Sequence, residues 1–232
     1  MQTTSSKNIG YLSLTLVLAE LASRIAQYMN IAASDISPLL VIYTPNQAYL
    51  MWLAYLMCVL LIPHTELSSF KHISSEPKKL ITSLYKVLCT SFGLYLVHTF
   101  VFPMHSLPIS SSPYSGLFIS LYESVHEEVF LRLILFSTLF LGLRKLFRDR
   151  PQNRTSLLWA CNVLIASVTV GIHILSASML PEMTTLELPK MIVIYALPSL
   201  VYGQIFWTQG VWVAMIAHFF TTYLAHLLMI YG

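Results

Sequence analysis

The fold of this chain is decided by residues 124–132, which read SVHEEVFLR. Three charged side chains, Glu127, Glu128 and Arg132, stand here inside a long, mostly apolar run over residues 116–143. A run of that length is typical of a membrane-spanning helix. Each charge inside such a span costs about 2.5–3.5 kcal/mol on insertion scales. We therefore expect these side chains to face the protein interior and to mark the functional site.

The composition predicts an integral membrane protein. Of the 232 residues, 56% are hydrophobic and only 10% are charged, whereas a soluble domain carries about 25% charged residues. The formal net charge of +3 is too small to argue for a nucleic-acid partner. The three cysteines, Cys58, Cys89 and Cys161, lie in apolar stretches without paired spacing. We interpret them as buried small hydrophobes, not as disulfide partners or zinc ligands.

Apolar runs divide the chain into about seven predicted spans, so the expected fold is an all-α, polytopic transmembrane helix bundle. The predicted spans cover residues 11–29, 47–62, 80–102, 114–143, 157–180, 191–207 and 211–231. Lysine and arginine concentrate in the loops at 64–79 and 144–154, two spans apart, which predicts that both loops are cytoplasmic. We divide the chain into three N-terminal spans, residues 1–113, and a C-terminal core of four spans, residues 114–232, which holds the candidate site.

The two adjacent carboxylates are expected to have different tasks, because neighbouring acids in a low-dielectric site resist being ionised together. On an α-helix, Glu128 and Arg132 are one turn apart and can form an ion pair. Glu127 is then rotated by about 100° from Glu128 and faces elsewhere. We predict that Arg132 keeps Glu128 charged, while Glu127 acts as a general base that takes a proton from water.

Two further predicted spans carry histidines. His173 follows Gly171, which we expect to let another helix approach closely. His218 and Thr222 are one turn apart and can direct two hydrogen bonds at one ligand atom, as an oxyanion hole requires. At a rise of about 1.5 Å per residue the two histidines lie at different depths, so only tilted or longer helices bring them level.

One glutamate and two histidines are also a zinc-ligand set of the hydrolase type. The spacing alone leaves open whether an attacking water is bound by zinc or is held by the glutamate and histidine side chains.

The order and spacing of these residues resemble the CPBP family of intramembrane proteases. This family includes the CAAX prenyl endopeptidases of the Ras-converting type and the bacteriocin-processing Abi proteins. Residues 127–132, EEVFLR, match the family motif E-E-x-x-x-R. Residues 169–173, TVGIH, correspond to F-x-x-x-H, with Thr169 where Phe is usual. Residues 218–222, HFFTT, correspond to H-x-x-x-N/D, with Thr222 in the Asn position.

The resemblance, which covers about residues 117–227, implies an enzyme: an intramembrane endopeptidase of the glutamate type that needs no metal, with a zinc-dependent form as the alternative. Glu127 and His173 would activate the attacking water, and His218 with Thr222 would stabilise the oxyanion. The site residues that the resemblance implies are Glu127, Glu128, Arg132, His173, His218 and Thr222.

The expected partners are a peptide or protein substrate in the membrane and the lipid bilayer, with no nucleic acid. We expect a bacterial or archaeal cell membrane, with the endoplasmic reticulum as the alternative. A second hypothesis is a catalytically inactive family member that acts as a membrane scaffold or immunity factor, which Thr222 keeps open. A third is a proton-coupled transporter with Glu127, His173 and His218 as a relay, although the sequence shows no related halves.

Overall fold

A computed structural model describes residues 113–147, 154–177 and 188–231, together with scattered helical residues within 13–21 and 81–96. These residues form helices and no strand, which confirms the all-α prediction for this part of the chain. The three predicted N-terminal spans lie wholly or largely outside the described residues. The count of seven spans and the division at residue 113 therefore stay predictions.

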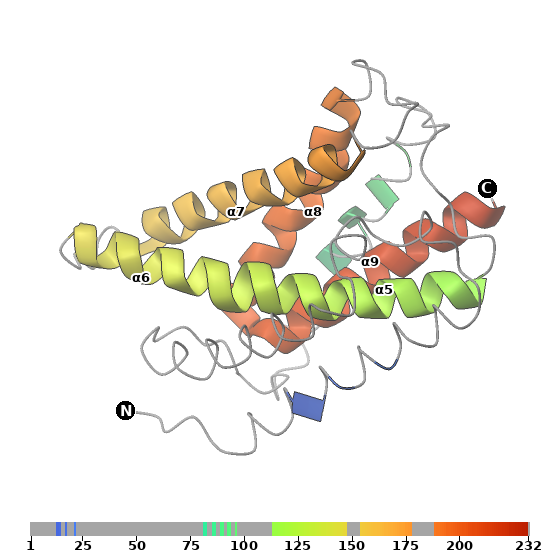
Figure 1. Ribbon diagram of the computed structural model, residues 1–232, viewed down its shortest axis with the longest axis horizontal. Helices are drawn as coiled ribbons and strands as arrows, with labels where there is room; N and C mark the ends of the chain where they lie inside the picture. The colour runs from blue at the N-terminus through green and yellow to red at the C-terminus, as the bar shows by residue number, and fades with distance from the viewer. Residues whose placement is uncertain are drawn as a thin grey trace.

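In the C-terminal half, the helical segments form long rods (Figure 1). Their segments are α5 (Pro113–Glu127), η5 (Glu128–Phe136), α6 (Ser137–Leu146), α7 (Arg154–Ala177), α8 (Leu188–Gln209) and α9 (Val211–Tyr231). The first three segments make one continuous rod, whose middle segment is a π-helix and not the expected α-helix. Gly210 joins α8 to α9 with a φ angle of 100°, a conformation that glycine adopts without strain.

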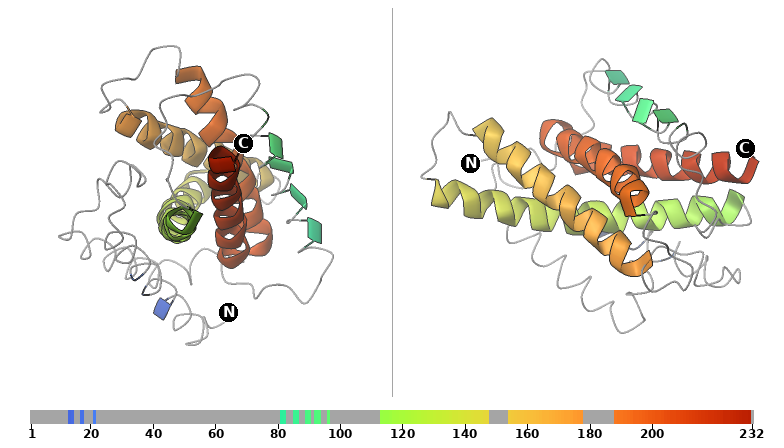
Figure 2. Two further views of the ribbon diagram at one scale, coloured as in Figure 1. Left: turned by 90° about the vertical axis from the view of Figure 1, so that its right-hand side faces the viewer. Right: turned by 90° about the horizontal axis from the view of Figure 1, so that it is seen from above.

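The rods pack obliquely around the middle of the long one. α5 packs against α9, α7 against α8, and α8 against α9. Figure 2 shows α7 crossing the rod of α5, η5 and α6 at an angle. This tilt brings residues from different positions along the helices to the same level.

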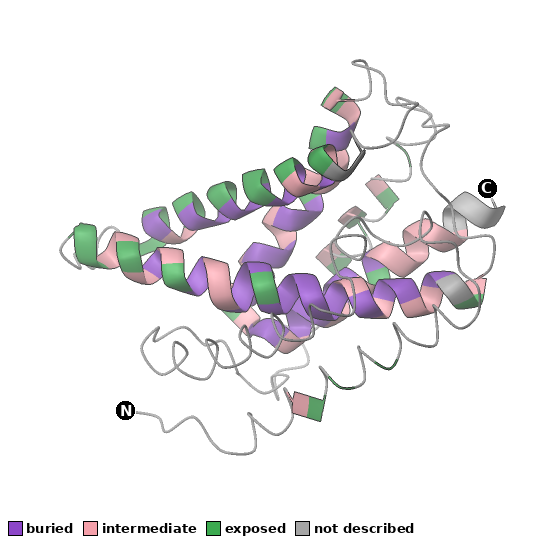
Figure 3. Cartoon of the chain, viewed as in Figure 1, coloured by how far each residue is buried: buried purple, intermediate pink, exposed green. Residues whose placement is uncertain are grey.

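Two of the described helices, Arg154–Leu175 and Leu188–Gln209, are long and apolar enough to cross a membrane, and Val211–Leu227 is a shorter apolar helix. The outward face of α7 is largely exposed along its length (Figure 3). That face is apolar, with exposed Trp159, Val163, Leu164, Val168 and Leu175. Such a face fits a surface in contact with lipid.

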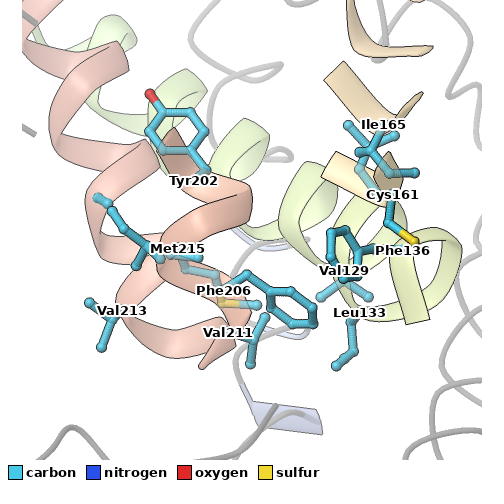
Figure 4. Packing of buried hydrophobic residues seen from close by; sticks show 14 of the residues in the cluster. Val129, Leu133, Phe136, Cys161, Ile165, Tyr202, Phe206, Val211, Val213 and Met215 are labelled. Carbon is cyan, nitrogen blue, oxygen red and sulfur yellow. The ribbon is translucent and has the colours of Figure 1, made fainter. Parts of the chain in front are cut away.

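The hydrophobic core surrounds η5. Val129 and Phe136 of this segment are fully buried. The ring of Phe136 meets Phe206 of α8 edge-on, with centroids 5.5 Å apart (Figure 4). Cys161 is buried in the same core as predicted, whereas Cys89 is exposed, so the prediction is wrong for Cys89; Cys58 lies outside the described residues. The segment that carries Glu128 and Arg132 is thus surrounded by the hydrophobic core.

A close helix–helix contact occurs at Gly203, not at Gly171 as expected. A Cβ atom built on Gly203 would overlap the side-chain oxygen of Asn162 on α7. Asn162 is fully buried and donates a hydrogen bond from Nδ2 to the carbonyl of Leu200 at 2.9 Å. At Gly171, in contrast, no described atom lies within 4 Å of such a Cβ. The prediction of a close approach at Gly171 is therefore wrong within the described part of the chain.

Replacing Gly203 by alanine is expected to lower the free energy of unfolding by about 1–3 kcal/mol, because the new methyl group forces α7 and α8 apart. The matched control is Gly171→Ala, which adds the same atom to an open surface. Thermal unfolding in detergent micelles, followed by far-ultraviolet circular dichroism, compares the two variants. Equal midpoints for both variants would contradict the tight contact at Gly203.

Candidate active site

Three helices bring their polar side chains together around Glu127, the last residue of α5. Its carboxyl oxygen Oε1 lies 3.6 Å from Nε2 of His173 on α7. Its other oxygen, Oε2, lies 3.9 Å from Nε2 of His218 on α9. All three side chains are buried. The difference in depth expected from the sequence is thus absent, since the two histidines meet the same carboxylate.

Glu128 also reaches His218, which corrects the expectation that the two glutamates face different directions. Oε1 of Glu128 lies 3.0 Å from Nδ1 of His218, at hydrogen-bond distance. The imidazole of His218 therefore stands between the two carboxylates. Carboxylates at neighbouring positions can both reach this ring because Nδ1 and Nε2 lie on different edges of it. A π-helix begins at Glu128, and π-helical turns recur at functional sites.

Arg132 pairs with Glu128, as the spacing predicts. Its Nη1 lies 3.6 Å from Glu128 Oε1, and both side chains are almost completely buried, with exposed fractions of 1% and 0%. The guanidinium also donates from Nη2 to the side chain of Ser199 at 2.7 Å and to its carbonyl at 3.2 Å. Arg132 is thus fastened to α8 as well as to its own helix.

Thr169, which stands where the family motif has Phe, extends the hydrogen bonds of Arg132 and Ser199. Its hydroxyl lies 3.2 Å from the Ser199 hydroxyl and donates to the carbonyl of Ile165 at 3.0 Å. Because the Thr169 proton is used in that bond, the Ser199 hydroxyl is the donor between the two. The hydrogen bonds then run in one direction, from Arg132 through Ser199 and Thr169 to a backbone carbonyl.

Both histidines of the site lie flat against tyrosines of α8. The rings of Tyr195 and His173 are stacked with centroids 3.8 Å apart and an angle of 6° between their planes. The rings of Tyr202 and His218 are stacked at 4.6 Å and 17°. Together with Ser199, these residues were not found from the sequence, because uncharged side chains in an apolar run give no distinctive signal. The spacing of four and three residues among them was the available clue.

Thr222 is not joined to the other five candidate residues. It is half-buried, and within the described part of the chain it makes no hydrogen bond. Its neighbour Thr221 is buried and donates to the carbonyl of Ala217 at 3.0 Å. The structure therefore brings together Glu127, Glu128, Arg132, His173 and His218, and leaves Thr222 outside their contacts.

The separations around Glu127 allow a bridging water. Distances of 3.6 and 3.9 Å between carboxylate oxygens and imidazole nitrogens exceed a direct hydrogen bond, so a water molecule is the natural link. A carboxylate with two imidazole nitrogens beside it can orient a water and accept its proton. Within the described ranges, no group of three or more His, Cys, Asp or Glu residues is arranged to hold a metal ion.

Comparison with known proteins identifies one family. The family model described as type II CAAX prenyl endopeptidase, Rce1-like, matches residues 109–224, half of the chain. The matched region holds the whole cluster around Glu127. No curated protein and no solved structure matches the chain.

Proposed function

Because the chain belongs to the Rce1-like family of type II CAAX prenyl endopeptidases, we propose that it hydrolyses a peptide bond of a lipidated, membrane-associated substrate with water activated by Glu127. The observation that carries this proposal is the position of the Glu127 carboxylate, 3.6 Å from His173 and 3.9 Å from His218 in a buried site. A general base must lie within reach of the water that it deprotonates, directly or through hydrogen-bonded neighbours.

In the proposed reaction, Glu127 and His173 hold the attacking water between them. Glu127 accepts one proton of the water while the water oxygen forms a bond to the carbonyl carbon of the substrate. The electron pair of the carbonyl double bond moves to its oxygen. When the carbon–nitrogen bond breaks, the proton on Glu127 passes to the leaving amine.

His218 is proposed to stabilise the negative oxygen of this intermediate. Its Nδ1–H donates to Glu128, which leaves the Nε2 side of the ring turned towards Glu127 and the reacting atoms. In the imidazolium form the ring also carries a proton on Nε2, and this N–H can donate a hydrogen bond to the oxyanion. Arg132 and Glu128 then act on the reaction through His218. The oxyanion role of Thr222 stays a prediction, which its present contacts do not support.

The test compares peptides by mass spectrometry from three strains: one with the intact gene, one with the gene deleted, and one with the gene restored. We expect specific peptide termini in the membrane or secreted fraction to vanish on deletion and to return on restoration. If no terminus changes, the chain is not a peptidase under these conditions of growth, and the scaffold or immunity hypothesis takes its place.

The substrate class is tested with the purified chain in lipid vesicles. Two synthetic peptides with the same C-terminal CAAX sequence differ only in a farnesyl group on the cysteine. We expect cleavage after the cysteine of the farnesylated peptide. Equal cleavage of both peptides would reject the lipid requirement and keep the peptidase. Cleavage of neither would direct the search to the termini found in the strains.

Removal of metal is expected to leave peptide cleavage unchanged, because the proposed water is held by Glu127 and His173 themselves. The purified chain is dialysed against a zinc chelator, and the rate of cleavage is measured before and after dialysis. Metal content is measured in the same samples by mass spectrometry. A loss of activity that returns on addition of zinc would contradict this prediction and establish the zinc-dependent form.

A further inference from the structure

One face of α8 carries three residues that each contact a different part of the candidate site. Tyr195, Ser199 and Tyr202 are spaced by four and then three residues, so they lie on the same side of the helix. None of them carries a charge, and none belongs to the three motifs. We call these three residues the positioning face.

Tyr195 controls the orientation of His173. The two rings lie almost parallel at 3.8 Å between centroids, so the imidazole cannot rotate without displacing the phenol ring. His173 needs this control, since its Nδ1 has no hydrogen-bond partner among the residues that the structure describes. A histidine usually owes its ring orientation to a hydrogen bond on the second nitrogen. Here, the stacked ring replaces that bond.

Tyr202 has the corresponding position at His218. Its ring is stacked on the imidazole at 4.6 Å, and the guanidinium carbon of Arg132 lies 5.9 Å from the centre of the same ring. Tyr202 is itself 3% exposed and packed in the hydrophobic core, so it is a rigid support. One tyrosine therefore contacts both the group that faces the oxyanion and the cation of the buried ion pair.

Ser199 lies between the two tyrosines and fixes Arg132. Its hydroxyl accepts the guanidinium hydrogen bond at 2.7 Å and donates a hydrogen bond to the Thr169 hydroxyl at 3.2 Å. Pro198 precedes it inside the helix. A proline inside a helix removes a backbone hydrogen bond and bends the helix. Because the guanidinium donates to Ser199, the position of the Arg132 head group is set by α8 as well as by η5.

We propose that Tyr195, Ser199 and Tyr202 are positioning residues, which hold His173, Arg132 and His218 in the orientation that the reaction requires. This inference rests on the proposed function and extends it to a helix that carries none of the motif residues. The three residues do not touch the reacting atoms in this scheme. Small errors of orientation at an active site are costly, since a misplacement of about 1 Å can lower a rate by about 100-fold.

The test uses Tyr195→Leu and Tyr202→Leu, which remove the aromatic ring, beside Tyr195→Phe and Tyr202→Phe, which retain it. The matched control is Tyr223→Leu on α9, whose ring is stacked on Phe219 and not on a histidine. In the lipid-vesicle assay we expect the leucine variants to lose about tenfold or more in kcat with little change in KM, because substrate binding is not their task. The phenylalanine variants and the control should keep kcat within about threefold, since an aromatic ring or an unrelated site is then preserved.

A second measurement does not depend on catalysis. Nuclear magnetic resonance of the chain labelled with nitrogen-15 at histidine reports the ring environment of each histidine, and His173→Asn and His218→Asn assign the two signals. We expect Tyr195→Leu to shift the His173 signals and Tyr202→Leu to shift the His218 signals, while Tyr223→Leu shifts neither. Ser199→Ala, compared with Ser199→Thr, should lower kcat only where the hydroxyl is lost.

The two measurements separate the possible failures. If the intact chain cleaves no peptide although each leucine variant shifts its own histidine, the proposed function fails and the contacts themselves are real. If the intact chain is active but the leucine variants keep its kcat, the positioning role is refuted. Unselective shifts of both histidines in every variant would refute it as well, because they would indicate a general loss of packing.

Discussion

The Glu127→Gln variant is expected to accumulate in the membrane like the intact chain and to cleave its substrate at least about 100-fold more slowly. An amide has nearly the size and shape of the carboxylate that it replaces, so the packing around α5 is preserved. It cannot accept the proton of the attacking water. General base catalysis contributes about 100- to 10,000-fold to a rate, which sets the scale of the expected loss.

The matched control is Glu123→Gln, which makes the same chemical change one helical turn earlier on α5, at a half-buried position. This variant should retain most of the cleavage activity. In the comparison of strains, the peptide termini lost on deletion should stay missing when Glu127→Gln is supplied and should return with Glu123→Gln. The abundance of each variant in the membrane fraction is measured by immunoblotting.

The result also separates the remaining functions. If Glu127→Gln restores everything that the deletion removes, Glu127 is not catalytic, and the motifs are architecture for binding a partner. A proton-coupled transporter would lose its function gradually with conservative changes at Glu127, His173 and His218. A peptidase loses cleavage outright at Glu127.

The charged residues of the site could be predicted from the sequence because a charged side chain in a membrane span is stable only in the protein interior. Glu127, Glu128 and Arg132 interrupt an apolar run, and the cost of exposing them to lipid directs them to the interior of the bundle. The structure places them there, beside His173 and His218. Order and spacing along the chain were enough to name the members of the cluster.

The orientation of those residues could not be predicted in the same way. Helical spacing predicts the rotation between neighbouring side chains, but not which side chain of another helix comes between them. His218 of α9 enters between the two carboxylates and contacts both, so they share one partner instead of facing apart. Sequence spacing contains no signal for this contact, because it depends on how the rods pack.

The contribution of α8 was missed for a different reason. Tyr195, Ser199 and Tyr202 are ordinary residues of an apolar span, and their roles arise only from the contacts that a tilted helix makes with three other segments. The same tilt decides which glycine lies at a helix–helix contact. Gly203 packs against Asn162, whereas Gly171 is exposed and has no described atom close to it. Composition and spacing cannot distinguish these two glycines before the helices are placed.

The Arg132→Met variant is expected to be the least stable of the single substitutions, with a loss of about 3–5 kcal/mol in the free energy of unfolding. Methionine fills part of the volume of the arginine but removes the guanidinium that pairs with Glu128. Glu128 is completely buried, so its charge cannot be solvated by water and keeps only the hydrogen bond to His218. The loss comes from this poorly compensated carboxylate more than from the missing attraction itself.

The double variant Glu128→Gln with Arg132→Met tests that explanation. It also removes the buried negative charge of Glu128, so most of the lost free energy of unfolding should return. The ion pair has incomplete hydrogen bonding, since within the described part of the chain Oε2 of Glu128 and both Nε and Nη1 of Arg132 have no hydrogen-bond partner. A neutral pair of similar size is therefore expected to lower the free energy of unfolding only slightly, as is often found for buried ion pairs.

Activity should not return with stability in the double variant, because Glu128 also holds His218 through the bond of 3.0 Å to Nδ1. A neutral glutamine does not stabilise the imidazolium that the oxyanion requires, and removal of one oxyanion donor costs about 100- to 1,000-fold in kcat. Unfolding in detergent micelles and peptide cleavage are measured on the same preparations. Recovery of both properties together would show that the pair serves only the fold, whereas recovery of stability alone assigns Glu128 and Arg132 a part in orienting His218 for the reaction.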